Sequence, residues 1–215
     1  MADPGVETIP GMDVTAHIRA AILEGEFAPH QRLIEADLTE QFGASRAAVR
    51  TALLTLAGEG LVERLPNRGA RVRAISVREA IEIVEVRVRL ESLVARKAAE
   101  AVDDEGVAEL TRLRERIQAA VAGGDLVTYT ATHQELDRTV RRISAHTTAT
   151  QLLERLQAQS ARHQFRLGFL PGRAATSAPE HIAIIDAIIA GDPDRADAAT
   201  RAHLEGIVGL LRAMD

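Results

Sequence analysis

The sequence predicts a mainly α-helical protein: an N-terminal winged helix-turn-helix of three helices and a small β-hairpin wing, followed by an all-helical bundle of six to seven helices. Two observations predict this fold. Residues 38–72 contain two helical segments around a turn at Gly43 and then a hairpin, which is the layout of a winged helix-turn-helix. Beyond Arg73 the apolar residues recur with helical periodicity along the rest of the 215-residue chain.

Turn and capping residues place the N-terminal elements. Residues 1–11 contain two prolines and two glycines without periodicity, which predicts a flexible tail. Ser45 is an N-cap residue and Gly60 a helix stop. Helices are expected over 13–25, 38–42 and 46–59, with a wing turn over 66–69. Together these elements predict a DNA-binding domain over residues 12–74.

The remaining residues, 75–215, predict one all-helical domain. Ser76 followed by Glu79 is a capping box at its start. Glycine and proline interrupt the helical pattern at 123–124, 171–172 and 191–193. Helices are expected at about 77–101, 104–122, 125–145, 148–169, 179–190 and 194–213.

The composition excludes several classes of protein. The chain has no cysteine, which removes disulfides, thiolate zinc sites and cysteine nucleophiles. No apolar run approaches the roughly 20 residues that span a membrane, and the N-terminus lacks the pattern of a secretory signal. We therefore expect a cytoplasmic protein without a membrane partner. The net charge of −5 does not exclude DNA, because DNA binding needs only a local basic face.

Such a face is predicted on the third helix. Arg46 and Arg50 lie one turn apart beside the small Ala47, so this helix can enter the major groove while the guanidinium groups reach base edges or phosphates. Ser45 can offer its hydroxyl and backbone N–H to a phosphate. The wing adds Arg64, Arg68, Arg71 and Arg73. The alternative is a solvated basic face on an ordinary helical corner.

Residues 17–72 resemble the winged-helix domain of the GntR family of bacterial transcription regulators. The resemblance is carried by Ile22, Gly25, Leu33, Glu35, Leu38, Ser45-Arg46, Val49-Arg50, Ala52-Leu53, Leu56, Gly60-Leu61-Val62 and Asn67-Arg68-Gly69. It implies that the contacts to double-stranded DNA come from Ser45, Arg46, Ala47, Arg50, Arg68 and Gly69.

Three histidines of the second domain lie on apolar helix faces: His133, His181 and His203. An inward polar side chain needs a partner, and Asp137 lies one turn from His133. Three imidazoles and one carboxylate would suit zinc, nickel or a similar divalent ion with open positions for a small molecule. The alternative is a set of core histidines satisfied by hydrogen bonds.

Residues 77–211 resemble the FCD domain, the helical effector domain of the FadR-type branch of GntR regulators. Matching residues include Arg87, Leu90-Glu91, Asp125, Tyr129, Arg173, Glu180-His181, Gly191-Asp192 and His203-Leu204. The resemblance implies that residues 75–215 are an effector-binding and dimerisation domain. Many members bind a metal through an aspartate, a histidine one turn later and two histidines on the last helices. Here the order on the first of these helices is reversed. The resemblance implies metal binding by His133, Asp137, His181 and His203, and a carboxylate effector near Arg87 and Arg173. Salt bridges on the helix surface are the alternative for these arginines.

The sequence therefore predicts a ligand-responsive transcription regulator, more often a repressor than an activator. It would bind a palindromic operator as a homodimer and sense a small organic acid at a metal-containing site. We do not expect an enzyme, because no H-E-x-x-H motif or separate general base accompanies the proposed ligands. A metal-dependent enzyme and a constitutive DNA-binding protein without an effector are the alternatives.

Overall fold

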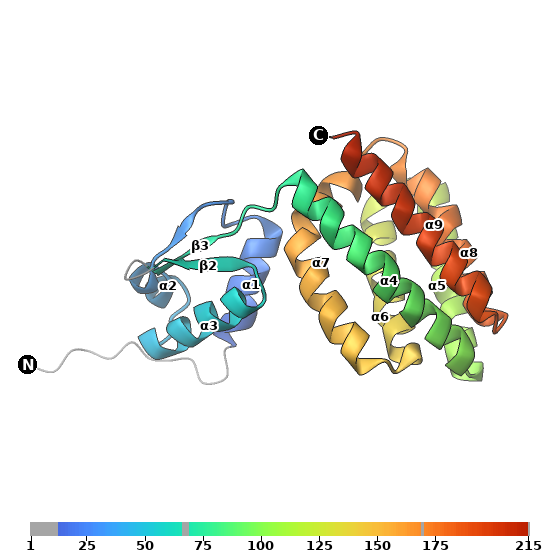
Figure 1. Cartoon of the computed structure of the whole chain (residues 1–215), viewed down its shortest axis with the longest axis horizontal. Helices are drawn as coiled ribbons and strands as arrows, with labels where there is room; N and C mark the ends of the chain where they lie inside the picture. Colours follow the sequence, from blue (N-terminus) through green and yellow to red (C-terminus); the bar gives the residue numbers. More distant parts are fainter. Residues whose placement is uncertain (1–12, 66–68, 169, 215) are drawn as a thin grey trace, which may run out of the picture. The chain divides into compact units, whose positions relative to one another are not determined.

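The computed structural model describes residues 13–65, 69–168 and 170–214 (Figure 1). The tail predicted over 1–11 lies outside this range. The described residues form nine α-helices and one three-stranded antiparallel sheet, which confirms the predicted fold class. The chain divides into two compact units, one made of Met1–Ile75 with Gln157–Arg162 and the other of Ser76–Leu156 with His163–Asp215.

The first unit contains α1 (Val14–Glu24), α2 (Glu35–Gln41) and α3 (Arg46–Gly58). Their ends follow the capping residues. The Asp13 side chain accepts a hydrogen bond from the amide of Ala16 at the start of α1. The Ser45 side chain does the same for the amide of Ala48, with an Oγ–N distance of 3.2 Å. Each cap satisfies an amide that has no partner within the helix.

The wing is a sheet of three strands, β1 (Arg32–Leu33), β2 (Val62–Leu65) and β3 (Gly69–Val72), in the order β1-β3-β2. The β2–β3 hairpin was predicted, whereas β1 was not. Leu33 of β1 lies opposite Ala70 and is 1% exposed, so burial against the wing holds this strand in place. A strand of two residues is too short to produce the alternating pattern that identifies a strand in a sequence.

Apolar faces of the three helices and the sheet form one core in this unit. Val49 and Leu56 of α3 are fully buried against Ile18 of α1 and Leu38 of α2. The guanidinium of Arg19 on α1 also makes two hydrogen bonds to the Glu59 carboxylate, at 2.7 and 2.9 Å. The core-facing side of α3 is thereby packed, and the opposite side of the helix is exposed to solvent.

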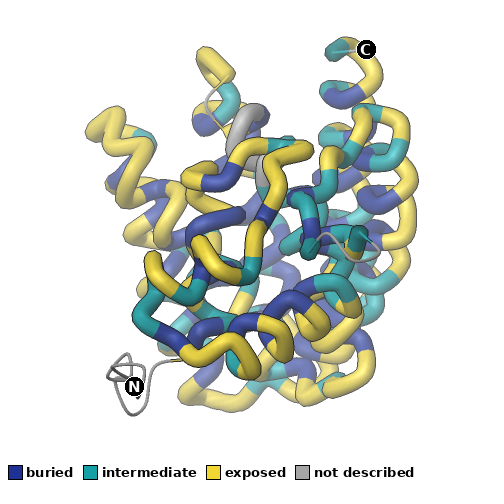
Figure 2. The backbone as a smooth tube through the Cα atoms, turned by 90° about the vertical axis from the view of Figure 1, so that its left-hand side faces the viewer, coloured by how far each residue is buried: buried dark blue, intermediate teal, exposed yellow. Residues whose placement is uncertain are grey.

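The second unit is a bundle of six helices among the described residues, within the predicted number. The helices are α4 (Val77–Ala101), α5 (Asp104–Ala122), α6 (Leu126–Ser144), α7 (Thr147–Gly168), α8 (Arg173–Ile189) and α9 (Pro193–Arg212). α4 packs along α9 (Figure 1). Along the helices buried residues recur every three to four positions, so that one face of each helix is buried and the other is exposed (Figure 2). None of the described helices combines the length and apolar character that crossing a bilayer requires.

Two helix starts were predicted wrongly. The second helix was expected over 38–42, but α2 already begins at Glu35. Its N-cap Ile34 makes no side-chain capping hydrogen bond, so the sequence carried no capping signal there.

We also expected a helix over 179–190, after the interruption at 171–172. The observed α8 begins at Arg173, after Gly172 has turned the chain with a φ of 77°. Pro179 therefore lies inside the helix, where it lacks the N–H for one backbone hydrogen bond. The longer helix places Arg173 and Ser177 on the same element as His181.

Candidate functional site

The front of α3 is exposed as the DNA-binding prediction requires. Ser45, Arg46, Ala47 and Arg50 are all exposed, while Val49 on the opposite side is 0% exposed. The Ser45 oxygen accepts a hydrogen bond from within the helix, and its hydroxyl hydrogen can still be donated. These four residues thus form one continuous exposed surface at the first turns of α3.

Arg50 makes an ion pair with a carboxylate of the neighbouring helix. Its Nη2 atom lies 3.1 Å from Oε2 of Glu35 on α2. The Arg50 side chain is 65% exposed, and ion pairs between solvent-exposed side chains contribute little to stability. A phosphate can therefore replace Glu35 as the partner of this guanidinium at little cost.

The arginines of the wing have different roles. Arg64 is exposed, whereas Arg71 pairs with Glu63 on the adjacent strand. Arg73 donates from Nη1 to the Gly60 carbonyl oxygen at 3.1 Å. Arg68, predicted as a DNA contact, lies outside the described residues. Arg64 is therefore the wing arginine whose described surroundings best suit an external anion.

Gly69, the other predicted wing contact, begins β3 in the left-handed backbone region with a φ of 81°. A Cβ atom at this position would lie 2.7 Å from the carbonyl oxygen of Leu33. Both facts require glycine here. This residue shapes the wing, and any contact to DNA would come from its backbone.

The second unit brings the three predicted histidines together. His133 on α6, His181 on α8 and His203 on α9 each offer a ligand nitrogen, and these atoms lie within 4.8 Å of one another. The Nε2 atoms of His181 and His203 are 3.3 Å apart. The rings of His133 and His181 are stacked, with centroids 4.1 Å apart. This group, the histidine cluster, could hold a metal ion.

Asp137, the fourth predicted ligand, lies beside the histidine cluster and not among its close ligand atoms. Its Oδ1 atom is 3.7 Å from Nε2 of His133. Its Oδ2 atom is 3.5 Å from Nη2 of Arg141. The carboxylate is thus shared between a histidine of the cluster and an arginine one turn further along α6.

Three residues that were not predicted as site residues hold two of the histidine rings. Glu180 Oε2 lies 2.7 Å from Nδ1 of His203. The Tyr129 hydroxyl lies 3.1 Å from Nδ1 of His181 and 2.5 Å from Oγ of Ser177. Tyr129 could have been found, since it precedes His133 by four residues on the same helix face. Glu180 gave no such signal, because adjacent helix residues point in different directions.

These bonds are compatible with two states of the histidine cluster. When Glu180 accepts the Nδ1 proton of His203, the Nε2 atom of His203 is an acceptor. It can then receive the Nε2 proton of His181, whose Nδ1 accepts from Tyr129. When His181 instead carries its proton on Nδ1 and donates it to the Tyr129 hydroxyl oxygen, the Nε2 atoms of His181 and His203 are both available to a metal. The geometry therefore fits a metal and equally fits a closed chain of hydrogen bonds.

The electrostatics favour neutral imidazoles. Burial lowers the pKa of His181 well below its ordinary value, and the neighbouring His133 and His203 lower it further. Burial also lowers the pKa of His133, although the charge of Asp137 opposes the shift. Burial alone would raise the pKa of Glu180, but its bonds to His203 and Arg173 lower it overall. Neutral imidazole is the form of histidine that binds metals.

The two predicted effector arginines lie near the histidine cluster. Arg87 on α4 is 4% exposed and donates from Nε to Glu91 Oε1 at 2.8 Å. Its Nη1 atom is buried without a hydrogen-bond partner among the described residues. Arg173 contacts Glu180, with 3.4 Å between Nη2 and Oε2. The charge of Arg87 acts on His133 and that of Arg173 on His181, so both lie near the cluster.

Comparisons with known proteins agree with both units. Residues 11–72 match "Bacterial regulatory proteins, gntR family" and residues 82–206 match "FCD domain". The chain is 27% identical to the uncharacterized HTH-type transcriptional regulator YdhC of Bacillus subtilis, over 50% of this chain and 48% of that protein. It thus spans about half the length of that relative.

Two further similarities extend over most of the chain. The HTH-type transcriptional repressor GlaR of Escherichia coli is 25% identical, over 92% of this chain and 93% of that protein. The solved structure of E. coli McbR/YncC superposes with a TM-score of 0.77, covering 94% of this chain and 96% of that chain. Because its identity is 22%, this similarity supports the fold alone.

The FCD domain match covers more than half of the chain, and the gntR match covers the winged helix-turn-helix. The family and the relatives consist of transcription regulators and not of enzymes, which confirms that prediction and excludes the enzyme alternative. The chain belongs to the gntR family of bacterial regulatory proteins, with an FCD domain after its winged helix-turn-helix.

Proposed function

We propose that this protein is a repressor that binds a palindromic operator as a homodimer and responds to a small carboxylate bound in its helical domain. Residues 12–74 would bind DNA, and residues 75–215 would bind the effector and dimerise, as in the FadR-type branch. The exposed front of α3 carries this proposal. Because its target is chromosomal DNA, the protein would act in the cytoplasm.

DNA binding rests on the chemistry of α3. Arg46 and Arg50 are exposed on one side of the helix, and Ala47 between them is small. Such a surface can approach base edges closely while its guanidinium groups bind guanine or phosphate. Ser45 lies at the positive end of the helix, which favours a phosphate. A two-fold dimer would place two α3 helices in successive major grooves.

Effector binding rests on the histidine cluster and Arg87. His133, His181 and His203 would hold a divalent metal, zinc or nickel, with Asp137 beside them. A bound metal would supply a Lewis-acid site for a carboxylate oxygen. Arg87 has a buried Nη1 without a partner among the described residues, and burying such a group unsatisfied costs about 1–3 kcal/mol. An effector carboxylate would satisfy this donor.

The residues around the cluster orient it. Glu180 fixes the His203 ring, and Tyr129 and Ser177 fix the His181 ring. Arg173 would bind a second anionic group of the effector once that group competes with Glu180. An effector that binds one arrangement of the dimer more tightly would change operator affinity by the coupling free energy. The relative named a repressor supports repression as the activity, and the response that we propose is loss of DNA binding.

Gel-shift titration of the protein on DNA from its own promoter region tests the DNA-binding part. We expect a sequence-dependent complex that weakens with added salt, because counterions are released from neutralised phosphates. A protein that shows no affinity for this DNA above its affinity for unrelated DNA would contradict the proposal.

Elemental analysis of the purified protein, followed by a thermal-shift screen of small carboxylic acids, tests the effector part. We expect about one metal per chain and a raised melting temperature with a cognate acid. Metal-free protein whose melting temperature responds to no added metal or acid would favour hydrogen-bonded core histidines. The protein would then be a constitutive DNA-binding protein.

A further inference from the structure

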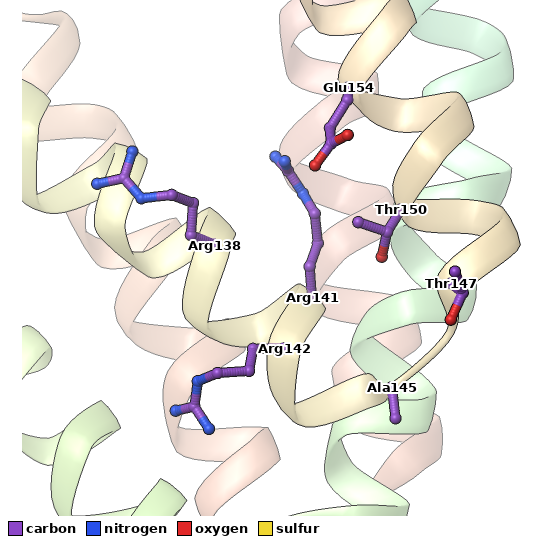
Figure 3. A pocket seen from close by; sticks show the side chains of 7 residues that line it. All are labelled: Arg138, Arg141, Arg142, Ala145, Thr147, Thr150 and Glu154. Carbon is purple, nitrogen blue, oxygen red and sulfur yellow. The ribbon is translucent and has the colours of Figure 1, made fainter. Parts of the chain in front are cut away.

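A pocket of about 350 Å³ lies between the end of α6 and the start of α7 (Figure 3). Its volume is within the range of small-molecule sites. It is lined by Arg138, Arg141, Arg142, Thr147, Thr150 and Glu154. Three arginines, two threonines and one glutamate thus line the same space, and none of these residues is part of the histidine cluster.

We propose that this pocket is a second anion site, which takes a small molecule bearing phosphate or carboxylate groups and is linked to the histidine cluster through Arg141 and Asp137. The proposal goes beyond the effector site proposed above, because it concerns a different space and different residues.

The arrangement of the arginines supports an anionic ligand. Residues 138, 141 and 142 are spaced so that they lie on one side of α6. Arg141 extends between α6 and α7 towards Glu154, while Arg138 and Arg142 extend from α6 on the side away from α7 (Figure 3). The Arg141 side chain is only 12% exposed. A largely desolvated guanidinium binds phosphate and carboxylate groups with two parallel hydrogen bonds.

The position of these arginines at the end of α6 accounts for part of the positive charge around the pocket, but not for all of it. Arg141 and Arg142 lie in the last turn of α6, where cations interact favourably with the helix dipole. Arg142 also pairs with Glu109. Arg138 lies one turn earlier and is exposed, so neither reason applies to it. α7 begins at the same place, and its first turn adds positive potential and the Thr147 and Thr150 hydroxyls.

Arg141 connects the pocket to the histidine cluster. Its Nη2 atom contacts Asp137 Oδ2 at 3.5 Å, and the other oxygen of Asp137 lies 3.7 Å from His133 Nε2. An anion that draws the Arg141 guanidinium towards the pocket weakens its contact with Asp137. The Asp137 carboxylate is then left to His133, and the two sites influence each other's affinity reciprocally.

Nuclear magnetic resonance titration of the full chain with inorganic phosphate, and separately with succinate, tests the site. Sodium chloride at matched ionic strength is the reference. We expect saturable shifts of backbone amides in residues 138–154 with at least one of the two anions. Arg138→Glu reverses one charge at an exposed position and should weaken this binding by about tenfold or more. Arg155→Glu makes the same change at an exposed position of α7 outside the pocket and should leave binding unchanged.

Binding that is equally strong in Arg138→Glu would overturn the proposal, since the anion would then occupy another place such as the histidine cluster. Absence of saturable shifts with both anions would overturn it too. The link is read from the imidazole signals of His133, which should move when the pocket is saturated in the wild type and stay unmoved in Arg141→Gln. Saturation that leaves these signals unmoved in the wild type would refute the link through Asp137.

Discussion

Replacing Glu180 with glutamine is expected to weaken metal binding while leaving every histidine in place. Glu180 Oε2 accepts a hydrogen bond from His203 Nδ1 at 2.7 Å. Hydrogen bonds to charged groups contribute about 1.5–3 kcal/mol and neutral ones about 0.5–1.5 kcal/mol, so the neutral amide weakens the bond by about 1–1.5 kcal/mol. Since 1.4 kcal/mol corresponds to a factor of ten, the metal dissociation constant should rise about tenfold. Glu180→Ala removes the bond altogether and should cost up to about 100-fold.

Competition between the protein and a chromophoric zinc chelator measures these constants directly. Glu205→Gln is the matched control, because it makes the same substitution at an exposed position on α9. Far-ultraviolet circular dichroism verifies that each variant is folded. Equal zinc affinity in Glu180→Gln, Glu205→Gln and the wild type would refute the inference that Glu180 orients a metal ligand. An unchanged affinity in Glu180→Ala would refute it more strongly.

Three further outcomes follow from the same structure. His181→Ala and His203→Ala should each lose the bound metal, and full metal content in both variants by elemental analysis would exclude the proposed ligands. Burial holds the pKa of His181 in the folded chain well below the ordinary 6.5. Below about pH 6.5 the unfolded chain therefore binds more protons than the folded chain, and the free energy of unfolding of the metal-free protein falls as the pH is lowered. Urea unfolding from pH 7.5 to 5 should show this fall, and His181→Phe should reduce it; an equal fall in both proteins would contradict the assignment. Gly69→Ala places a Cβ atom against the Leu33 carbonyl oxygen at a positive φ. It should lower the free energy of unfolding by about 1–3 kcal/mol, measured by the same urea unfolding. A stability equal to that of the wild type would contradict this expectation.

Local signals in the sequence predicted most of the helix boundaries. Ser45 gave the start of α3, and Ser76 gave the start of α4 at Val77. Each side chain accepts a hydrogen bond from an amide three residues later. Such caps act within one turn of the chain, so no tertiary information is needed to recognise them.

Features that depend on packing between distant segments were missed. Leu33 forms a strand because β3 and the core lie against it, and two residues carry no pattern of their own. The helix expected from residue 179 begins earlier, at Arg173, because Gly172 turns the chain into it. In both cases the element depends on packing or turn geometry outside the residues that were expected to form it.

The histidine cluster was predictable in its members but not in its geometry. Position on apolar helix faces singled out His133, His181 and His203, and helix packing brings them together. The Asp137 carboxylate contacts both His133 and Arg141, with Oδ1 3.7 Å from His133 Nε2 and Oδ2 3.5 Å from Arg141 Nη2. No sequence pattern specifies these distances. The pairing of Glu180 with His203 joins two helices and was equally hidden. The arginine-lined pocket likewise appears only once α6 and α7 are in place.

The proposed DNA-binding role of α3 is tested most directly by the operator affinity of Arg46→Ala/Arg50→Ala, measured over a range of salt concentrations. Both side chains are exposed, so the variant should remain folded. We expect its binding free energy to weaken by about 1–3 kcal/mol for each base that an arginine recognises in the wild type. Its salt dependence should flatten by about 0.9 for each phosphate that is no longer neutralised. The exposed Arg112→Ala on α5 should match the wild type. A double variant that binds the operator as tightly as the wild type, with the same salt dependence, would contradict the account.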